Sequence, residues 1–157
     1  MDTNHLELTR VAHADPTDCP YYLMTRASLA ATSELKRALA AADLAVVRPA
    51  YLGVLFCLAK EDGQRVVDLG RGAGLEPSTM TGLLDRMERD ELIERRPDEE
   101  DRRALRIFLT ERSRQALPQI AEARDSLLAK LLAGVSPVEL IAARRTLAAV
   151  LENASRD

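Results

Sequence analysis

The chain of 157 residues has the size of one domain with a continuous core, which disfavours a multidomain enzyme. Hydrophobic residues make up 46% and charged residues 30%, so the chain is too apolar to be intrinsically disordered. Aromatic residues account for only 3%, with no Trp, which favours helices packed through aliphatic side chains over a β-sandwich.

The formal net charge of −3 argues at first against a nucleic-acid partner, because binding to phosphates requires positive surface charge. The 22 basic residues, however, comprise 19 Arg and 3 Lys, and the planar guanidinium suits both phosphates and base edges. A biased genomic base composition would give the same excess of Arg, so the composition alone does not separate the two explanations.

Other classes of site and location are disfavoured by simple patterns. Cys19 and Cys57 lack the spacing of a zinc site, so neither a metal nor another cofactor is expected. No apolar run approaches the ~18 residues of a membrane span, and the first residues lack the basic and apolar regions of a secretory signal. We therefore expect a cytoplasmic protein that does not contact membranes.

The first part of the chain predicts an extension followed by helices. Residues 1–18 are polar and weakly patterned, so they are expected to form an N-terminal extension. A long helix is expected over 20–43, where Leu and Ala recur at helical spacing and no Gly or Pro follows Pro20. A second helix should begin near Pro49, a residue suited to the first helical position, and end at the polar stretch 61–64.

A helix-turn-helix pattern comes next. A short helix is expected over 66–72, a tight connection over 73–75 and a third substantial helix over 77–89. One face of this third helix is apolar and is expected to be buried: Met80, Leu83, Leu84 and Met87.

The periodicity then changes from helical to alternating. Segments 92–96 and 105–109 predict two short strands, and the charged segment 97–103 between them predicts a β-hairpin with a long solvent-exposed tip. Two long helices follow, over 111–133 and from a Ser136/Glu139 capping box to Asn153. Four apolar residues of the last helix are expected to face inward: Leu140, Leu147, Val150 and Leu151. The predicted fold is mainly α with a small β-hairpin, a winged helix-turn-helix with long terminal helices.

The first turns of the helix over 77–89 carry short polar side chains. A DNA recognition helix requires such residues, because they can approach base edges in a major groove that just admits the helix. Ser78, Thr79 and Thr81 occupy these turns, and Arg86 follows on the same side. The alternative is a solvated helix face on which Ser and Thr only cap the helix start.

The hairpin tip favours the DNA-binding interpretation. Its residues Asp101, Arg102 and Arg103 place arginines where a wing enters the minor groove, in which the negative potential is strongest. Asp101 is spaced to hold the guanidinium of Arg103 in a bidentate pair. The alternative is a charged loop kept polar for solubility. Three more arginines flank the tip and could line the same face: Arg95, Arg96 and Arg106.

At this point a family resemblance can be stated. The stretch VVDLGRGAGLEPSTMTGLLDRMERDELIERRPDEEDRRALRIFLTERSR, residues 66–114, resembles the winged helix-turn-helix of the multiple antibiotic resistance regulator (MarR) family. The most specific part is DRRALRIFLT, residues 101–110, which matches the family's Asp-x-Arg followed by a strand ending in Leu-Thr. The sequence departs from the family at Glu76, where Ser or Asp commonly caps the helix, at Gly82, where a larger polar residue is frequent, and at Ser113, where Gly is usual.

The resemblance implies a single domain over 19–157, in which 48–110 form the winged helix-turn-helix lobe and 19–47 and 111–157 form dimerisation helices. It also implies a homodimer that binds double-stranded DNA at a pseudo-palindromic operator. In each protomer the DNA-contacting residues would be Ser78, Thr79, Thr81, Arg86, Asp101, Arg102 and Arg103.

Members of this family commonly hold a small aromatic or phenolic effector between the dimerisation helices and the DNA-binding lobe. Four residues are candidates to line such a cleft, with ordinary core or interface packing as the alternative: Tyr21, Tyr22, Met24 and Tyr51.

Cys19 precedes the first long helix, whose dipole favours a thiolate, and the family's hydroperoxide-sensing branch has a reactive Cys near this point. An incidental exposed thiol is the alternative.

Catalysis is not indicated. His5 and His13 lie in the extension, and no catalytic motif occurs in a folded context, so an enzyme is not expected.

We expect a sequence-specific DNA-binding transcriptional regulator, specifically a repressor released by a small ligand or by oxidation. The alternative is a winged-helix module that binds another protein without specific DNA binding, which an acidic surface would also suit.

Overall fold

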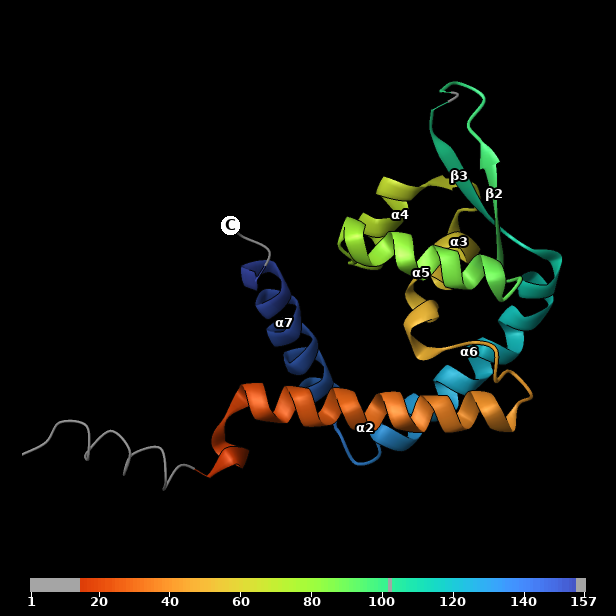
Figure 1. Cartoon of the computed structure of the whole chain (residues 1–157). Helices are drawn as coiled ribbons and strands as arrows, with labels where there is room; N and C mark the ends of the chain where they lie inside the picture. Colours follow the sequence, from red (N-terminus) through yellow and green to blue (C-terminus); the bar gives the residue numbers. More distant parts are fainter. Residues whose placement is uncertain (1–14, 102, 155–157) are drawn as a thin grey trace, which may run out of the picture.

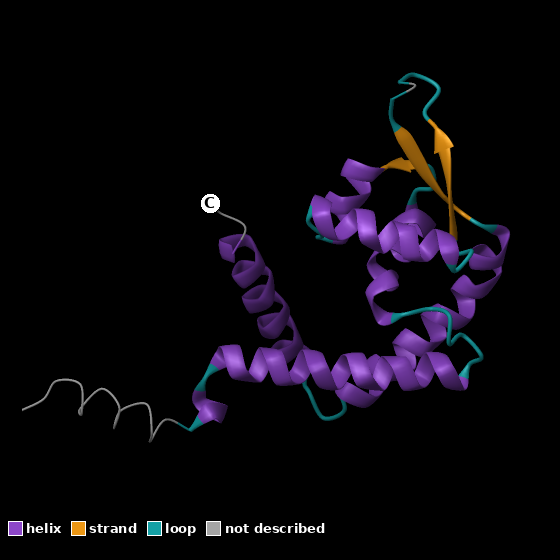
Figure 2. Cartoon of the chain, in the orientation of Figure 1, coloured by secondary structure: helices purple, strands orange, loops and turns teal. Residues whose placement is uncertain are grey.

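The computed structural model describes residues 15–101 and 103–154, so most of the expected extension, including His5 and His13, lies outside the described residues (Figure 1). Helices dominate the chain, and the strands gather in one small wing (Figure 2). The elements, with η for a 3-10 helix, are η1 (Pro16–Asp18), α2 (Pro20–Ala41), η2 (Pro49–Tyr51), α3 (Leu52–Lys60), β1 (Gln64–Arg65), α4 (Val66–Ala73), α5 (Pro77–Arg89), β2 (Ile93–Pro97), β3 (Leu105–Leu109), α6 (Glu111–Leu131) and α7 (Pro137–Ala154). The predicted mainly helical winged fold is confirmed.

The elements form a winged lobe and a base of long helices. The lobe runs from η2 to β3, and α6 leads from the end of the wing back to α2 (Figure 1). α2 and α6 pack against each other, and the Nζ atom of Lys130 donates to Oε2 of Glu34 at 2.7 Å across this contact. Because α6 contacts both the lobe and α2, a movement of the lobe relative to the base would involve α6.

The wing is a three-stranded antiparallel sheet with the order β1-β3-β2. The predicted hairpin is present, with Ile93 opposite Leu109 and Pro97 opposite Leu105. The third strand, β1, was not predicted; it pairs Gln64 with Ile107 along the other edge of β3. This pairing joins the wing to the residues just before the helix-turn-helix.

The core lies inside the winged lobe and extends to the C-terminal half of α2 and the middle of α6. The predicted apolar face of α5 is buried, with Met80, Leu83, Leu84 and Met87 each no more than 2% exposed. Leu39 of α2 and Ile120 of α6 belong to the same cluster. Within this core, α5 packs against α4, η2 and strand β2 of the wing.

The last helix, α7, differs from its prediction. Its capping box forms as expected, since the N–H of Ser136 donates to Oε2 of Glu139 at 2.8 Å and the N–H of Glu139 donates to Oγ of Ser136 at 3.3 Å. The inward orientation expected for its apolar residues is wrong: no described residue of α7 is buried, and Leu147 and Leu151 remain 48% and 72% exposed. The reason is that none of the other elements described in the chain covers this helix. Despite its apolar character, neither α7 nor any other described helix is long and apolar enough to cross a membrane.

Candidate nucleic-acid interface

The turn between α4 and α5 is tight because two glycines permit it. Gly74 follows α4 in the left-handed region, at φ +66°, and the N–H of Leu75 donates to the carbonyl oxygen of Gly70 at 2.9 Å. A Cβ atom on Gly70 would lie only 3.2 Å from Cγ of Met80. The two helices therefore approach closely, and α5 is fixed with its polar face outward.

The first turns of α5 present the predicted polar side chains to solvent. Ser78, Thr79 and Thr81 are all exposed. The hydroxyls of Ser78 and Thr79 form no hydrogen bond within the described part of the chain, whereas that of Thr81 donates to the carbonyl oxygen of Pro77 at 3.3 Å. Glu76, the N-cap residue, makes no side-chain cap hydrogen bond. Neither Ser78 nor Thr79 caps the helix start, so both hydroxyls are left to solvent on the exposed face of α5.

Arg86 adds a positive charge to this outer side of α5. The residue is exposed, and it forms no ion pair with any of the residues described. Its Nη1 atom lies 3.5 Å from the position that a Cβ atom on Gly82 would take. This distance is an ordinary contact, so the guanidinium of Arg86 lies directly beside Gly82 on the surface of the helix.

The charged tip of the wing differs from its prediction at Asp98. This residue is only 1% exposed, although the whole segment 97–103 was expected to be solvent-exposed. Its Oδ2 atom accepts hydrogen bonds from Nε of Arg65 at 2.7 Å and from Nε of Arg106 at 2.8 Å. The hydrogen bond from Arg65 and the one from the N–H of Glu100 hold the pKa of Asp98 well below its usual range, so it is a buried carboxylate ion.

Asp101 also differs from its prediction. Its Oδ1 atom accepts from the main-chain N–H of Arg103 at 3.0 Å, and no ion pair to the guanidinium of Arg103 occurs among the residues described. The carbonyl oxygen of Asp101 accepts from the N–H of Ala104 at 2.8 Å. Asp101 thus fixes the backbone of the turn and leaves the exposed guanidinium of Arg103 to solvent. Arg102, the third predicted wing residue, lies outside the described residues.

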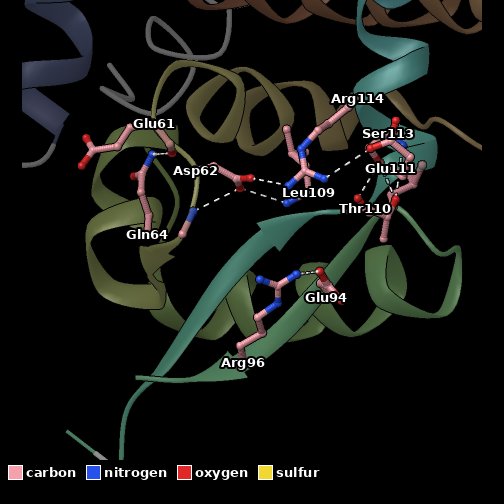
Figure 3. Close-up of polar contacts among 12 residues, drawn as sticks. Glu61, Asp62, Gln64, Glu94, Arg96, Leu109, Thr110, Glu111, Ser113 and Arg114 are labelled. Atoms are coloured by element: carbon pink, nitrogen blue, oxygen red, sulfur yellow. Dashed lines mark hydrogen bonds and ion pairs between the residues drawn. The ribbon is translucent and has the colours of Figure 1, made fainter. Parts of the chain in front are cut away.

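The arginines that flank the tip are committed to partners within the chain. Arg95 binds Glu88 and Asp85 of α5, the latter at 2.7 Å. Arg96 pairs with Glu94, as Figure 3 shows, and its guanidinium lies 4.5 Å from the centre of the Phe108 ring. Arg106 binds Asp98. These residues stabilise the wing, so they do not form the free row of arginines that was considered from the sequence.

The junction between the wing and α6 carries a dense set of polar contacts (Figure 3). The Oδ1 atom of Asp62 accepts from the N–H of Leu109 at 3.0 Å, and its Oδ2 atom accepts from Nη2 of Arg114 at 2.7 Å. The hydroxyl of Ser113, which is completely buried, donates to the carbonyl oxygen of Leu92. Ser113, a departure from the Gly usual in the family, thus ties the start of α6 to the residue just before β2. A rotation of α6 would therefore disturb the wing.

The four predicted effector residues are not brought together. Tyr51 is completely buried, and its hydroxyl donates to Oδ2 of Asp90 at 2.7 Å; burial and this hydrogen bond raise the pKa of Tyr51. Tyr21 and Tyr22 are 74% and 38% exposed near the start of α2, and Met24 is half-buried there. A side chain with no exposed surface lines no open cleft, so Tyr51 does not share one with the other three within this chain.

A small pocket that the sequence did not indicate lies at the hinge between the lobe and the base. Its volume is about 230 Å³, and it lies between the α2–η2 connection and the start of α6. Leu44, Val47 and Leu92 form apolar walls, while Arg112 and Gln119 supply polar groups. Nothing in the sequence pointed to this pocket, because its lining residues come from segments that are tens of positions apart.

The remaining reactive groups are few. Cys19 is the N-cap residue of α2; it is exposed, and its side chain makes no cap hydrogen bond. Cys57 is half-buried and is also a free thiol. Among the residues that the structure describes, no group of three or more His, Cys, Asp or Glu side chains is arranged to hold a metal ion.

Comparison with known proteins shows which family shares this sequence and fold. The model of the MarR family matches residues 49–105, which include the helix-turn-helix and most of the wing. The transcriptional repressor MdtR of Bacillus subtilis (strain 168) is 28% identical over 111 residues, covering 71% of this chain and 72% of the relative. YfiV, a transcriptional regulator of the same organism, is 33% identical over 107 residues, covering 66% and 67%.

A solved structure extends this likeness to the whole fold. The transcriptional regulator MOSR of M. tuberculosis, in a crystal structure with DNA, is 25% identical and superposes with a TM-score of 0.74 over 87% of this chain and 96% of that one. The helix-turn-helix, the wing and the long terminal helices are thus shared in order and in space. The chain belongs to the MarR family of winged-helix DNA-binding transcriptional regulators, which are not enzymes.

Proposed function

We propose that this regulator is a homodimeric repressor that binds a pseudo-palindromic operator and is released from it by a small ligand or by oxidation. The observation that carries the proposal is the exposed polar face at the start of α5, which lies beside a wing that presents Arg103 to solvent. The relatives include a named repressor, MdtR, which supports the proposal of a repressor.

The recognition helix α5 would enter the major groove. Ser78 and Thr79 are short and exposed, and their hydroxyls, unoccupied within the described chain, are able to donate to or accept from base edges. Thr81 and Arg86, farther along the same helix, would contact bases or phosphates. Backbone phosphates would set the register and the base contacts would set the sequence preference.

The wing would enter the adjacent minor groove. Arg103 is exposed and free of ion pairs with described residues, whereas Arg95, Arg96 and Arg106 are paired internally. The minor groove of A·T-rich DNA concentrates negative potential and attracts such an arginine. In this proposal Asp101 shapes the turn that carries Arg103, and Arg102 adds a phosphate contact.

The terminal helices would form the dimer. α7 exposes apolar side chains that no described part of the chain buries, among them Val138 at 77% and Ile141 at 59%. The first half of α2 exposes Leu29 at 63% as well. Apolar surface of this extent is typical of an interface. A two-fold dimer would place two α5 helices about one helical turn of DNA apart, which predicts half-sites with centres about 34–36 Å apart.

Release would follow from a change in the angle between the lobe and the base. We propose that a small aromatic or phenolic effector binds at this hinge, where the pocket beside Leu44 and Leu92 has apolar walls and Arg112 offers a cationic edge. Tyr21, Tyr22 and Met24 lie at the opposite end of α2 from this pocket, so they would line it from the second protomer of the dimer. The effector must bind the released conformation more tightly than the DNA-bound one.

Oxidation of Cys19 is the second proposed trigger. Its thiol is exposed at the start of α2, next to the proposed dimer surface. Peroxide should release the wild-type protein from its operator and leave a Cys19→Ser variant bound. Release of Cys19→Ser to the same extent as wild type would remove this trigger from the proposal.

The operator should be identified by selecting bound DNA from a random pool, and binding to it should then be measured by fluorescence anisotropy. Arg103→Ala should weaken operator binding by about 1–3 kcal/mol if this arginine makes a specific contact. Glu99→Gln, on the same wing, serves as a control for a nearby change in charge. If no sequence is enriched and Arg103→Ala has no effect, the chain would instead be a protein-binding module.

A further inference from the structure

Asp98 lies at the base of the wing, where four hydrogen bonds converge on one carboxylate. Arg65 and Arg106 donate to its Oδ2 atom at 2.7 and 2.8 Å. The main-chain N–H groups of Glu100 and Asp101 donate to its Oδ1 atom at 2.8 and 3.2 Å. Both oxygens are therefore used, although the surrounding segment is the most charged part of the chain.

The partners of Asp98 come from three separate segments. Arg65 is in β1, Arg106 is in β3, and the two N–H groups belong to the turn at the wing tip. Nη1 of Arg106 also donates to the carbonyl oxygen of Gly63 at 2.9 Å. A buried carboxylate is costly unless it is paired and hydrogen-bonded, so this arrangement strongly favours one conformation of the wing.

Hydrogen bonds connect Asp98 to the backbone of Arg103 through Asp101. Asp101, whose N–H is bound by Asp98, accepts from the N–H of Arg103 through its own carboxylate at 3.0 Å. Its carbonyl oxygen accepts from Ala104 at 2.8 Å, and the N–H of Asp98 donates to the carbonyl oxygen of Ala104 at 3.0 Å. The turn that carries Arg103 is thus closed on both sides by contacts that begin at Asp98.

We propose that Asp98 is a positioning residue for DNA recognition: by joining β1, β3 and the wing turn, it presents the guanidinium of Arg103 to the minor groove. The inference rests on the proposed minor-groove contact of Arg103. It also assigns Arg65 and Arg106 to the support of the wing and not to the binding of phosphates.

A positioning role and a simple effect of charge predict opposite changes in operator affinity when Asp98 is replaced. Removal of a carboxylate from a surface that meets phosphates strengthens electrostatic binding, because DNA repels negative charge. If Asp98 positions Arg103, its removal weakens binding to the operator while binding to random DNA stays equal or becomes tighter. The two effects have opposite signs, so one pair of measurements separates them.

The test compares Asp98→Asn with Glu99→Gln. Both variants lose one negative charge at the same wing, but Glu99 is exposed and makes no hydrogen bond or ion pair with the described residues. Fluorescence anisotropy should measure binding to the operator and to a scrambled duplex. Asp98→Asn should weaken operator binding severalfold, up to the loss of about 5- to 150-fold expected for Arg103→Ala. Glu99→Gln should weaken neither. Operator binding by Asp98→Asn that matches that by Glu99→Gln would overturn the inference.

A double-mutant cycle identifies the route of the effect. If Asp98 acts through Arg103, the variant Asp98→Asn/Arg103→Ala should bind the operator no more weakly than Arg103→Ala alone. Additive losses would mean that Asp98 acts by another route and would refute the positioning role. Wild-type binding by Arg103→Ala would refute the minor-groove proposal itself, and the role of Asp98 with it. A loss in Arg103→Ala without one in Asp98→Asn would refute only the role of Asp98.

A second variant covers the case in which Asp98→Asn does not fold, which a thermal melt would reveal. Arg65→Gln removes one guanidinium from Asp98 and leaves the wing sequence intact. It should weaken operator binding in the wild-type background and add nothing in the Arg103→Ala background. A loss that persists in the Arg103→Ala background would show a simple effect of charge and would overturn the inference.

Discussion

Dimerisation through α7 can be tested by shortening one exposed apolar side chain. Ile141 is 59% exposed in the single chain. Complete burial of such a side chain contributes about 1.5–3 kcal/mol, so burial of the exposed part contributes about 1–1.8 kcal/mol in each protomer. A two-fold interface contains the residue twice, which gives about 2–3.5 kcal/mol for the dimer. Ile141→Ala should therefore raise the dimer Kd by about 30- to 400-fold.

Sedimentation velocity over a range of concentrations measures this Kd. Val67→Ala is a matched control, because Val67 is also a largely exposed aliphatic residue, at 70%, but lies in α4 of the winged lobe. The control should dimerise like wild type. A wild-type chain that stays monomeric at micromolar concentration, or an Ile141→Ala dimer of unchanged Kd, would refute the assignment of α7 to the interface.

Three further predictions concern the lobe itself. Tyr51→Phe removes the hydrogen bond to Asp90 and should lower the free energy of unfolding by about 1–2 kcal/mol in urea titrations; an unchanged midpoint would count against a structural role for this contact. Gly63→Ala should destabilise the fold by more than about 1 kcal/mol, since its φ is +73° and a Cβ would lie 2.6 Å from Phe108, and wild-type stability would contradict this. The folded state holds the pKa of Asp98 low, so as the pH falls below about 4 the unfolded chain takes up that proton first and stability falls; Asp98→Asn should flatten this acid dependence, and an identical pH profile would refute it.

The elements that the sequence predicted well are those whose signals are local. α5 begins at Pro77 and ends at Arg89 as predicted, because proline suits the first helical position and the apolar residues repeat at helical spacing. The capping box at Ser136 and Glu139 formed for the same reason. Each of these features depends on residues within a few positions of one another.

The features that were missed depend on distant partners. β1 is only two residues long, and it is a strand because Gln64 and Arg65 pair with Ile107 and Arg106 of β3. Asp98 resembles its acidic neighbours in the sequence, and its burial is decided by Arg65, which lies 33 positions earlier. The apolar pattern of α7 predicted an inward helix face, but no described element of the chain covers this helix, so its apolar residues stay exposed.

The same contacts answer the objection raised by the net charge of −3. Residues 65–112 contain 10 Arg and 12 acidic residues, so even this half is not basic in sum. Many of these charges form ion pairs within the chain, as in the pairs of Arg95 with Glu88 and of Arg106 with Asp98. Arg86 and Arg103 are exposed outside such pairs, so a few placed arginines and the dimer geometry would determine binding.

The most direct test is a footprint of the dimer on its selected operator. Methylation protection should show two protected stretches of major groove about one helical turn apart on one face of the DNA, and hydroxyl radicals should show protected minor grooves beside them. Arg103→Ala should lose the minor-groove protection and keep the major-groove protection. A single protected stretch without two-fold symmetry, or equal binding to operator and random DNA, would contradict sequence-specific binding by α5 and the wing.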